Sequence, residues 1–382
     1  MNIHNLVIKI KNNRKILLNL FLIFLIYEFV IYLLVFLTNY HDLRAPLGNF
    51  SLLSLIAPLV RWDAGHYLTI AIDGYIYPNM AFFPLYPLLV KSLNFFIGDI
   101  VLSGLIVSWV SLFLAIFFLF KLIVIKLKDE NIAYLSIIFL LIFPFAIFYS
   151  TIYTEALFLF LTVAAFYFSE KKNWLLVGLL ACLASATRIF GILLFAVFLL
   201  VYLSDRKFDP KKIDKKILFI FLAPLGLIFY MIFLQIKFGD PLIFLKAQKE
   251  WATYGAFSMP WHTLFRQFKR VFDFNLLRNV SSFGYFMHVR DFFFWPIFLI
   301  CSIFVTKLLG WRYALYDFLT LLAISCKFPM MSANRYLIVL FPVYILLAVW
   351  SKNQVVRFFI FFFFACLFFF YTTLFIKGGF VG

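Results

Sequence analysis

The chain has 382 residues, of which 65% are hydrophobic, 22% are aromatic and only 13% are charged, whereas an ordinary soluble domain has about 25% charged residues. A mean hydropathy of +1.02 leaves too little polar surface to cover a compact particle in water, so a soluble globule is excluded. The formal net charge of +17 lies along the flanks of apolar runs. We therefore expect membrane lipids as partners and no nucleic acid.

Eleven apolar segments follow one another along the chain, and a helix needs about 20 such residues to cross a bilayer. They lie at residues 16–37, 100–125, 132–149, 155–169, 174–187, 190–204, 217–235, 291–308, 313–331, 336–350 and 358–376. The expected fold is an all-α polytopic membrane protein with about eleven transmembrane helices, forming a single domain over residues 1–382.

Basic residues in the short connections fix the orientation of these segments. Six of them fall between Arg206 and Lys216, and others lie at residues 126–128, 171–172, 312 and 352–357. Placing all of these connections in the cytoplasm requires the apolar run 174–204 to reverse near Arg188, which then lies at the outer surface. It also requires residues 82–97, which two prolines interrupt, to form a re-entrant or interfacial segment and not a crossing.

Two long loops then face outward, one over residues 38–99, which includes the re-entrant segment, and one over residues 236–290. The second loop is basic, which runs against the positive-inside tendency. In the first loop, apolar residues recur at helical spacing and predict an amphipathic helix lying on the membrane: Ala64, Tyr67, Leu68 and Ala71. Asp63, His66 and Asp73 occupy its polar face. The same residues also fit a plain surface helix that begins at an aspartate N-cap and ends at Asp73 and Gly74.

A series of short motifs follows in order between residues 61 and 342. They are Arg61-Trp62-Asp63-Ala64 with His66-Tyr67, Phe82-Phe83-Pro84-Leu85-Tyr86-Pro87-Leu88, Tyr153-Thr154-Glu155-Ala156-Leu157-Phe158, Ala184-Ser185-Ala186-Thr187-Arg188, Gly239-Asp240-Pro241-Leu242 with Ala247-Gln248 and Trp251, and Ser332-Ala333-Asn334-Arg335-Tyr336 with Phe341-Pro342. This series resembles the PIG-V family of GPI mannosyltransferases and its prokaryotic relatives, within the GT-C class of membrane glycosyltransferases.

The resemblance implies a GT-C fold and a sugar donor linked to polyprenyl phosphate, because nucleotide sugars are absent from the outer or lumenal face where this class works. The expected activity is transfer of a hexose, with mannose as the expected sugar, to a glycan, glycolipid or protein acceptor on that face. The expected location is the plasma membrane of a prokaryote or the endoplasmic reticulum membrane of a eukaryote. The lipid-linked donor is a co-substrate, and no other cofactor is expected.

The resemblance also suggests roles for individual residues. An acceptor hydroxyl must lose its proton to a base, and Asp63 matches the first acid of the family pattern, with Glu155 and His66 as further catalytic candidates. Glu155 is expected to line a cavity, because a carboxylate within a span is costly elsewhere. Arg188 and Arg335 suit the donor phosphate, since guanidinium binds phosphate oxygens in bidentate fashion. As plainer alternatives, Arg188 could cap a helical hairpin and Arg335 could be an interfacial residue that reaches the headgroups.

Further substrate-binding candidates lie in the matched motifs: Trp62, Asp73, Asp240, Gln248 and Trp251. The two tryptophans could stack on sugar or isoprenoid, although interfacial tryptophans are expected in any membrane protein. His66 could pair with Asp63 or join Asp73 at a metal, but two or three ligands on one helix form an incomplete site, so no metal is expected. The rival function is a transporter or flippase of a lipid-linked sugar, which would show broken helices in matched halves. No such duplication is visible.

Overall fold

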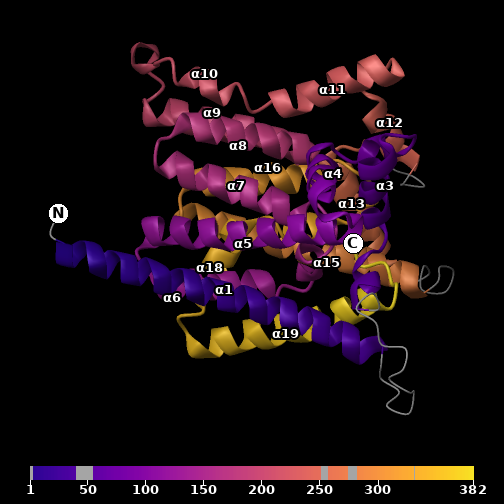
Figure 1. The fold of residues 1–382 in the computed structure, drawn as a ribbon, viewed down its shortest axis with the longest axis horizontal. Helices are drawn as coiled ribbons and strands as arrows, with labels where there is room; N and C mark the ends of the chain where they lie inside the picture. Colours follow the sequence, from indigo (N-terminus) through magenta and orange to yellow (C-terminus); the bar gives the residue numbers. More distant parts are fainter. Residues whose placement is uncertain (1–2, 40–54, 251–256, 274–281, 331) are drawn as a thin grey trace.

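The computed structural model describes residues 3–39, 55–250, 257–273, 282–330 and 332–382, and these residues form helices and no strand (Figure 1). An isolated antiparallel bridge joins Phe257 to Lys327. The helices that run along the bundle are α1 (Ile3–Asn39), α5 (Ile100–Leu127), α6 (Glu130–Leu141), α7 (Glu155–Glu170), α8 (Trp174–Thr187), α9 (Leu193–Asp205), α11 (Leu225–Phe238), α15 (Ser282–Leu308), α16 (Trp311–Ile324), α18 (Phe341–Trp350) and α19 (Gln354–Ile376). The chain is therefore all-α over the described ranges.

Four stretches of helix are long and apolar enough to cross a membrane. They are Asn13–Thr38, Ile100–Leu127, His288–Leu308 and Gln354–Ile376. A fifth is added if α11 and α12 (Ile243–Glu250), which are bent by 83° at their junction, form one broken span. Other apolar helices have only 10–17 residues, below the length of about 20 that a straight crossing needs. The described part of the chain is thus a helical membrane protein, whereas the count of eleven crossings stays a prediction.

Prolines explain why several predicted segments hold shorter helices. Proline lacks the backbone N–H that a helix interior needs, so helices end near it or begin with it. The segment 132–149 divides at Pro144 into α6 and the 3₁₀ turn η4 (Ala146–Tyr149), and the segment 217–235 divides at Pro224 into α10 (Ile217–Ile220) and α11. Pro342 lies in the first turn of α18.

Ion pairs gather the basic connections at one end of the bundle. Lys126 bonds Glu170 at 3.1 Å, Arg312 bonds Asp205, and Lys352 lies 3.7 Å from Asp129. These contacts bring together the connections after α5, α7, α9, α15 and α18, which lie toward the left of Figure 1. The chain also reverses between α8 and α9, through the turn η5 (Ile189–Ile192). This turn folds back closely on α8: an ideal Cβ at Gly191 would lie 2.3 Å from the Ala184 carbonyl, so only glycine fits at this position.

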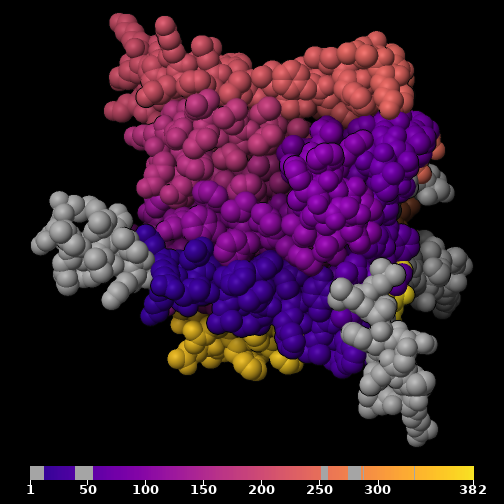
Figure 2. Space-filling model, in the orientation of Figure 1, coloured from indigo at the N-terminus to yellow at the C-terminus, as the bar shows by residue number. Residues whose placement is uncertain are grey.

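The two long loops contain helices at the opposite end. The first holds the 3₁₀ turn η2 (Ala57–Leu59), α3 (Asp63–Asp73), the 3₁₀ turn η3 (Asn79–Ala81) and α4 (Leu85–Ile97), and the second holds α12 and α13 (Pro260–Phe272). The predicted apolar stripe of α3 is buried, and the helices that cover α3 are α4 and α5. The expectation that this face would rest on the membrane is therefore wrong, because protein covers it. Figure 2 shows α3 and α4 as one block on this end of the bundle.

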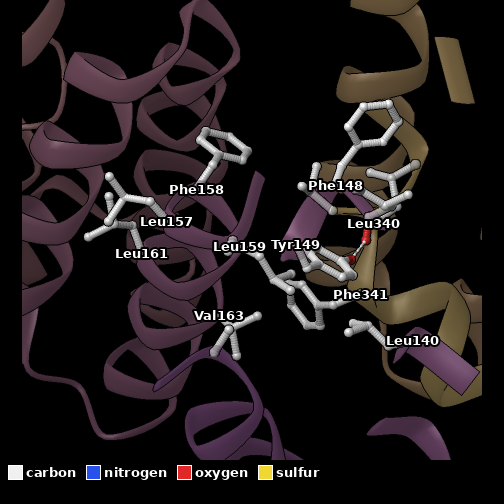
Figure 3. Close-up of a cluster of buried hydrophobic side chains, with 14 of the residues drawn as sticks. Leu140, Phe148, Tyr149, Leu157, Phe158, Leu159, Leu161, Val163, Leu340 and Phe341 are labelled. Carbon is white, nitrogen blue, oxygen red and sulfur yellow. Dashed lines mark hydrogen bonds between the residues drawn. The ribbon is translucent and has the colours of Figure 1, made fainter. Parts of the chain in front are cut away.

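The core is built around α7, which α5 and α8 flank. In Figure 3, Leu159 and Val163 of α7 lie toward Tyr149 and Phe341, and the Tyr149 hydroxyl donates to the Ile338 carbonyl at 2.5 Å. This packing ties η4 to the segment that leads from α17 (Ala333–Leu337) into α18. Because η4 precedes Glu155 and α17 contains Arg335, the core fixes both sides of the site described next.

Candidate active site

Asp63 is the first residue of α3, and its backbone position is set by an unusual turn. Trp62 before it has φ of 53°, a left-handed conformation that non-glycine residues seldom adopt and that needs support from its surroundings. Tyr153 provides this support: the Asp63 N–H donates to its hydroxyl at 3.2 Å, and the hydroxyl donates to the Arg61 carbonyl at 3.0 Å. The loop before α3 is thereby tied to the residues before α7.

Four charged side chains from distant parts of the chain meet at this point. Arg335 donates from Nη1 to Oδ2 of Asp63 and from Nε to Oε1 of Glu155. Arg188 donates from Nη1 to the same Glu155 oxygen at 2.6 Å. We call Asp63, Glu155, Arg188 and Arg335 the ion cluster. It joins α3, α7, α17 and the turn between α8 and η5.

Burial divides the two acids of the ion cluster. The Glu155 side chain is 0% exposed, whereas the Asp63 side chain is 27% exposed. Both arginines are buried, so the cluster holds two positive and two negative formal charges with little access to water. Buried charges are tolerated when they are paired in this way. Asp63 is therefore the acid of the cluster that a molecule from outside can reach.

Aromatic rings fix the planes of both guanidinium groups. The guanidinium carbon of Arg335 lies 4.5 Å from the centroid of the Tyr153 ring and 5.5 Å from that of Phe148. The guanidinium carbon of Arg188 lies 4.8 Å from the centroid of the Tyr336 ring. Arginine stacks on aromatic rings in a way that lysine does not reproduce, so these contacts restrict the directions in which the N–H groups point.

A second buried network supports the segment that carries Arg335. Arg290 donates from Nη2 to Oδ1 of Asp291 at 2.7 Å. Asn334 donates from Nδ2 to the same oxygen at 3.2 Å and to the Arg290 carbonyl at 3.0 Å. These bonds hold the start of α17 against α15 and so position Arg335.

Residues 376–382 form one wall beside the ion cluster. Arg61 donates from Nη2 to the Ile376 carbonyl at 2.9 Å, and Arg290 donates from Nη1 to the Phe380 carbonyl at 3.2 Å. The Phe380 ring meets the Trp62 ring edge to face at 5.3 Å. This wall leaves Trp62, which is exposed, at the rim of the site.

The remaining predicted residues lie outside the ion cluster. His66 bonds through Nδ1 to Oδ1 of Asn79 at 2.8 Å and stacks on Phe82. Asp73 is exposed at the end of α3, and Asp240 pairs with Lys246 at 2.6 Å. Gln248 is half-buried on α12, and Trp251 lies outside the described residues.

Two expectations about the arginines are corrected by these positions. Arg188 lies at the predicted reversal of the chain, but it is buried and not at the outer surface, because its guanidinium turns inward to Glu155. The alternative that Arg335 reaches toward the headgroups is wrong as well, because both of its acidic partners lie within the protein.

Sequence reasoning missed the residues that orient the ion cluster: Tyr153, Phe148, Tyr336 and the pair Arg290 and Asp291. Tyr153 and Tyr336 belong to the same motifs as Glu155 and Arg335. Their closeness in sequence to these charged residues could have indicated that they support them. For the Arg290 and Asp291 pair, the signal was the cost of placing two charges at the edge of an apolar span. Phe148 had no signal in a segment rich in phenylalanine.

The fold and the site together define a helical membrane protein with a buried ion cluster and one accessible acid at one end of the bundle. The chain belongs to the PIG-V mannosyltransferase family, because the family model described as Mannosyltransferase (PIG-V) matches residues 17–246. Asp63, Glu155 and Arg188 fall within this match, and Arg335 lies beyond it.

Curated relatives with a common description agree with the family. The chain is 32% identical to the GPI alpha-1,6-mannosyltransferase 2 of Rattus norvegicus over 161 residues, which cover 39% of this chain and 33% of that protein. It is 29% identical to the Mus musculus protein of the same name over 249 residues, which cover 57% of this chain and 50% of that protein. The chain thus spans half or less of the length of these relatives.

Proposed function

We propose that this protein transfers mannose from a polyprenyl-phosphate donor to a glycan, glycolipid or protein acceptor, on a GT-C fold of about eleven spans. The observation that carries the proposal is the ion cluster, in which an accessible carboxylate shares Arg335 with a buried one. Membership of a mannosyltransferase family and the similarity to rodent GPI alpha-1,6-mannosyltransferases support mannose as the sugar.

Asp63 is the proposed general base. A base must come within hydrogen-bond reach of the hydroxyl whose proton it removes. The Asp63 side chain is partly exposed and can be reached by an acceptor, whereas the Glu155 side chain is fully buried. The acceptor oxygen attacks the anomeric carbon as its proton passes to Asp63. The bond from that carbon to the phosphate oxygen breaks, and the electron pair leaves with polyprenyl phosphate. The transition state has the oxocarbenium character of glycosyl transfer.

The two arginines are the proposed partners of the leaving phosphate. A phosphodiester carries one negative charge, and the phosphate monoester that leaves carries up to two, so negative charge grows as the bond breaks. Charge-assisted bonds from fixed guanidinium groups are a strong way to stabilise such charge. Glu155 then acts as a positioning residue, because its Oε1 accepts bonds from both arginines and makes them converge.

Sidedness follows from the distribution of basic connections. Those connections share the end of the bundle opposite to the ion cluster, and short basic loops stay in the cytoplasm. The cluster is therefore proposed to face the extracytoplasmic or lumenal side, where a lipid-linked sugar is the available donor. Trp62 at the rim is the proposed contact for the sugar or for the first isoprene units.

Reconstituted protein tests the proposal directly. Purified protein in liposomes is given a panel of polyprenyl-phosphate hexoses and nucleotide-linked hexoses together with a membrane extract that supplies acceptors, and products are identified by mass. The expected result is a mannosylated product and free polyprenyl phosphate from the polyprenyl-phosphate mannose alone. Movement of intact lipid-linked sugar across the bilayer, with no bond cleaved, would instead identify a flippase.

A further inference from the structure

Helix α13, in the basic second loop, presents an apolar face away from the protein. Four large side chains lie on this face and are 50–63% exposed: Trp261, Phe265, Phe268 and Phe272. At 100° per residue, their positions fall within about 60° of one another around the helix axis. They form a continuous stripe, in which the ring centroids of Phe268 and Phe272 lie 4.6 Å apart.

The opposite face of α13 is polar and packs on α15. Thr263 and Gln267 are buried, and Gln267 donates from Nε2 to the His288 carbonyl at 3.0 Å. The Tyr285 hydroxyl donates to the Val271 carbonyl at 2.5 Å. A surface helix in water turns its apolar side inward and its polar side outward. Helix α13 does the reverse, so an apolar medium must cover its outer side.

The part of α15 that α13 contacts identifies that medium. Gln267 bonds the carbonyl of His288, a residue of the apolar stretch His288–Leu308, which is long enough to cross a membrane. Phe268 also contacts Phe292 at 6.4 Å between ring centroids, and the exposed side of the span continues from there through Phe293 and Ile297. The stripe of α13 is thus continuous with the exposed apolar surface of a candidate span, in the half of α15 that follows the second loop.

Two basic side chains follow the stripe on one side of α13. Around the helix axis Lys269 lies about 40° beyond Phe265 and Arg266 about 100° beyond it. Both are exposed, and neither forms an ion pair with an acid in the described ranges. The Arg266 guanidinium carbon lies 5.4 Å from the centroid of the Phe328 ring. The Lys269 ammonium lies 4.6 Å from the centroid of the Phe265 ring, so its charge sits directly beside the apolar stripe. Helices that lie in the membrane interface combine an aromatic face with such flanking charges.

We propose that α13 is an in-plane interfacial helix that inserts its aromatic stripe below the headgroups and binds anionic lipid phosphates through Arg266 and Lys269. This explains the basic second loop, which runs against the positive-inside tendency, as a lipid-binding device at the end of the bundle that holds the ion cluster. The proposal stands on membrane embedding alone and does not depend on the transfer reaction.

Depth-dependent quenching in nanodiscs tests the position of the stripe. A fluorescent amino acid is incorporated at position 265 of the full chain, at position 300 near the middle of the α15 stretch His288–Leu308, or at position 211 in a basic connection. Lipids carrying a nitroxide near the headgroup should quench position 265 most strongly, lipids carrying it deep in the chain should quench position 300, and position 211 should respond to neither. A response at 265 equal to that at 211 would overturn the proposal.

Lipid charge tests the second half. Quenching at 265 by nitroxide-labelled phosphatidylglycerol should exceed quenching by labelled phosphatidylcholine at the same mole fraction. Arg266→Gln with Lys269→Gln should remove most of this excess, since each charge near an anionic surface contributes about fivefold, while Lys215→Gln with Lys216→Gln should leave it unchanged. An equal response to both lipids in the parent protein would refute phosphate binding. A blue-shifted probe that no lipid quenches, together with cross-linking between two copies, would show that protein covers the stripe instead.

Discussion

Glu155→Gln is the substitution whose effect on stability follows most directly from the ion cluster. Glutamine has nearly the shape of glutamate, so packing around position 155 is retained while the negative charge is lost. Arg188 then has no acidic partner in the described part of the chain, and Arg335 keeps only Asp63. Because both arginines are buried, water cannot compensate for the lost charge.

The expected cost is about 3–5 kcal/mol, the range for breaking a buried ion pair by removing one partner. An effect of this size corresponds to a fall in the melting temperature of roughly 4–6 °C. An unfolding entropy of about 2.1 cal/mol/K per residue over 382 residues makes 1 kcal/mol worth about 1.2 °C. The larger figure of the energy range assumes that neither arginine finds a new partner.

A second substitution separates charge from packing. Adding Arg188→Met to Glu155→Gln removes one uncompensated cation, so the double variant should be more stable than Glu155→Gln alone, even though it carries more changes. Thermal unfolding in one detergent, followed by intrinsic fluorescence at a fixed scan rate, measures all variants. Lys212→Gln, which removes one partner of the solvent-exposed pair with Asp209, serves as the control and should leave the melting temperature unchanged.

Additive losses would refute the reasoning. If the double variant unfolded at a temperature lowered by the sum of the two single effects, Glu155 and Arg188 would contribute independently, and the ion cluster would not be an energetic unit.

Three further predictions concern the donor, the rim and the basic connection. Arg188→Lys and Arg335→Lys should each lower kcat/KM for the donor by about tenfold to a hundredfold, the contribution of one charge-assisted hydrogen bond. In steady-state kinetics the double variant should lose less than the product of the two single losses. A loss equal to that product would mean that the two arginines do not bind the same phosphate. Trp62→Ala should raise the KM for the donor with little change in melting temperature, because Trp62 is exposed. The control Trp311→Ala, at the opposite end of the bundle, should change neither quantity. An equal rise in KM for both variants would show that Trp62 does not contact the donor. The Arg206 guanidinium lowers the pKa of the Asp214 carboxyl to about 2, so the charged form persists well below neutral pH. Amide hydrogen exchange in the connection between α9 and α10, corrected for intrinsic rates, should therefore stay constant from pH 8 to about 5 and rise only between about pH 4 and 2. An increase already at pH 6 would contradict this prediction.

The sequence was sufficient to predict the helical membrane fold because hydropathy reports directly on the solvent of each segment. The reversal near Arg188 could also be predicted, since basic connections on both sides of one apolar run require an even number of crossings. The lengths of the helices could not be predicted in this way. Hydropathy does not register where Pro144 and Pro224 interrupt the backbone, so it joined α6 to η4 and α10 to α11.

The members of the ion cluster could be named one by one, but their pairing could not. Asp63 and Arg335 are separated by 272 positions in the chain, and no periodic pattern relates residues so far apart. The charges themselves gave a partial signal, because an acid such as Glu155 in an apolar run needs a partner. Which arginine would supply it depended on the packing of η4 against the segment before α18, and that packing rests on a tyrosine hydroxyl and a backbone carbonyl.

The burial of α3 shows a related limit. Its apolar spacing correctly indicated which side is covered, but periodicity does not distinguish lipid from protein as the covering partner. Helix α13 is the opposite case, because its apolar side is exposed in the folded chain while its polar side packs on α15.

A single-turnover experiment with Asp63→Asn tests most directly whether the ion cluster carries out the transfer. Excess protein in detergent is mixed with isotope-labelled polyprenyl-phosphate mannose and an acceptor extract, and the conversion of donor into polyprenyl phosphate and mannosylated product is followed by mass. Asparagine keeps the size of aspartate but cannot take up the proton, so the variant should bind donor and convert it about 100-fold or more slowly than the parent. Conversion at the parent rate by Asp63→Asn would show that another group removes the proton and would contradict the assignment.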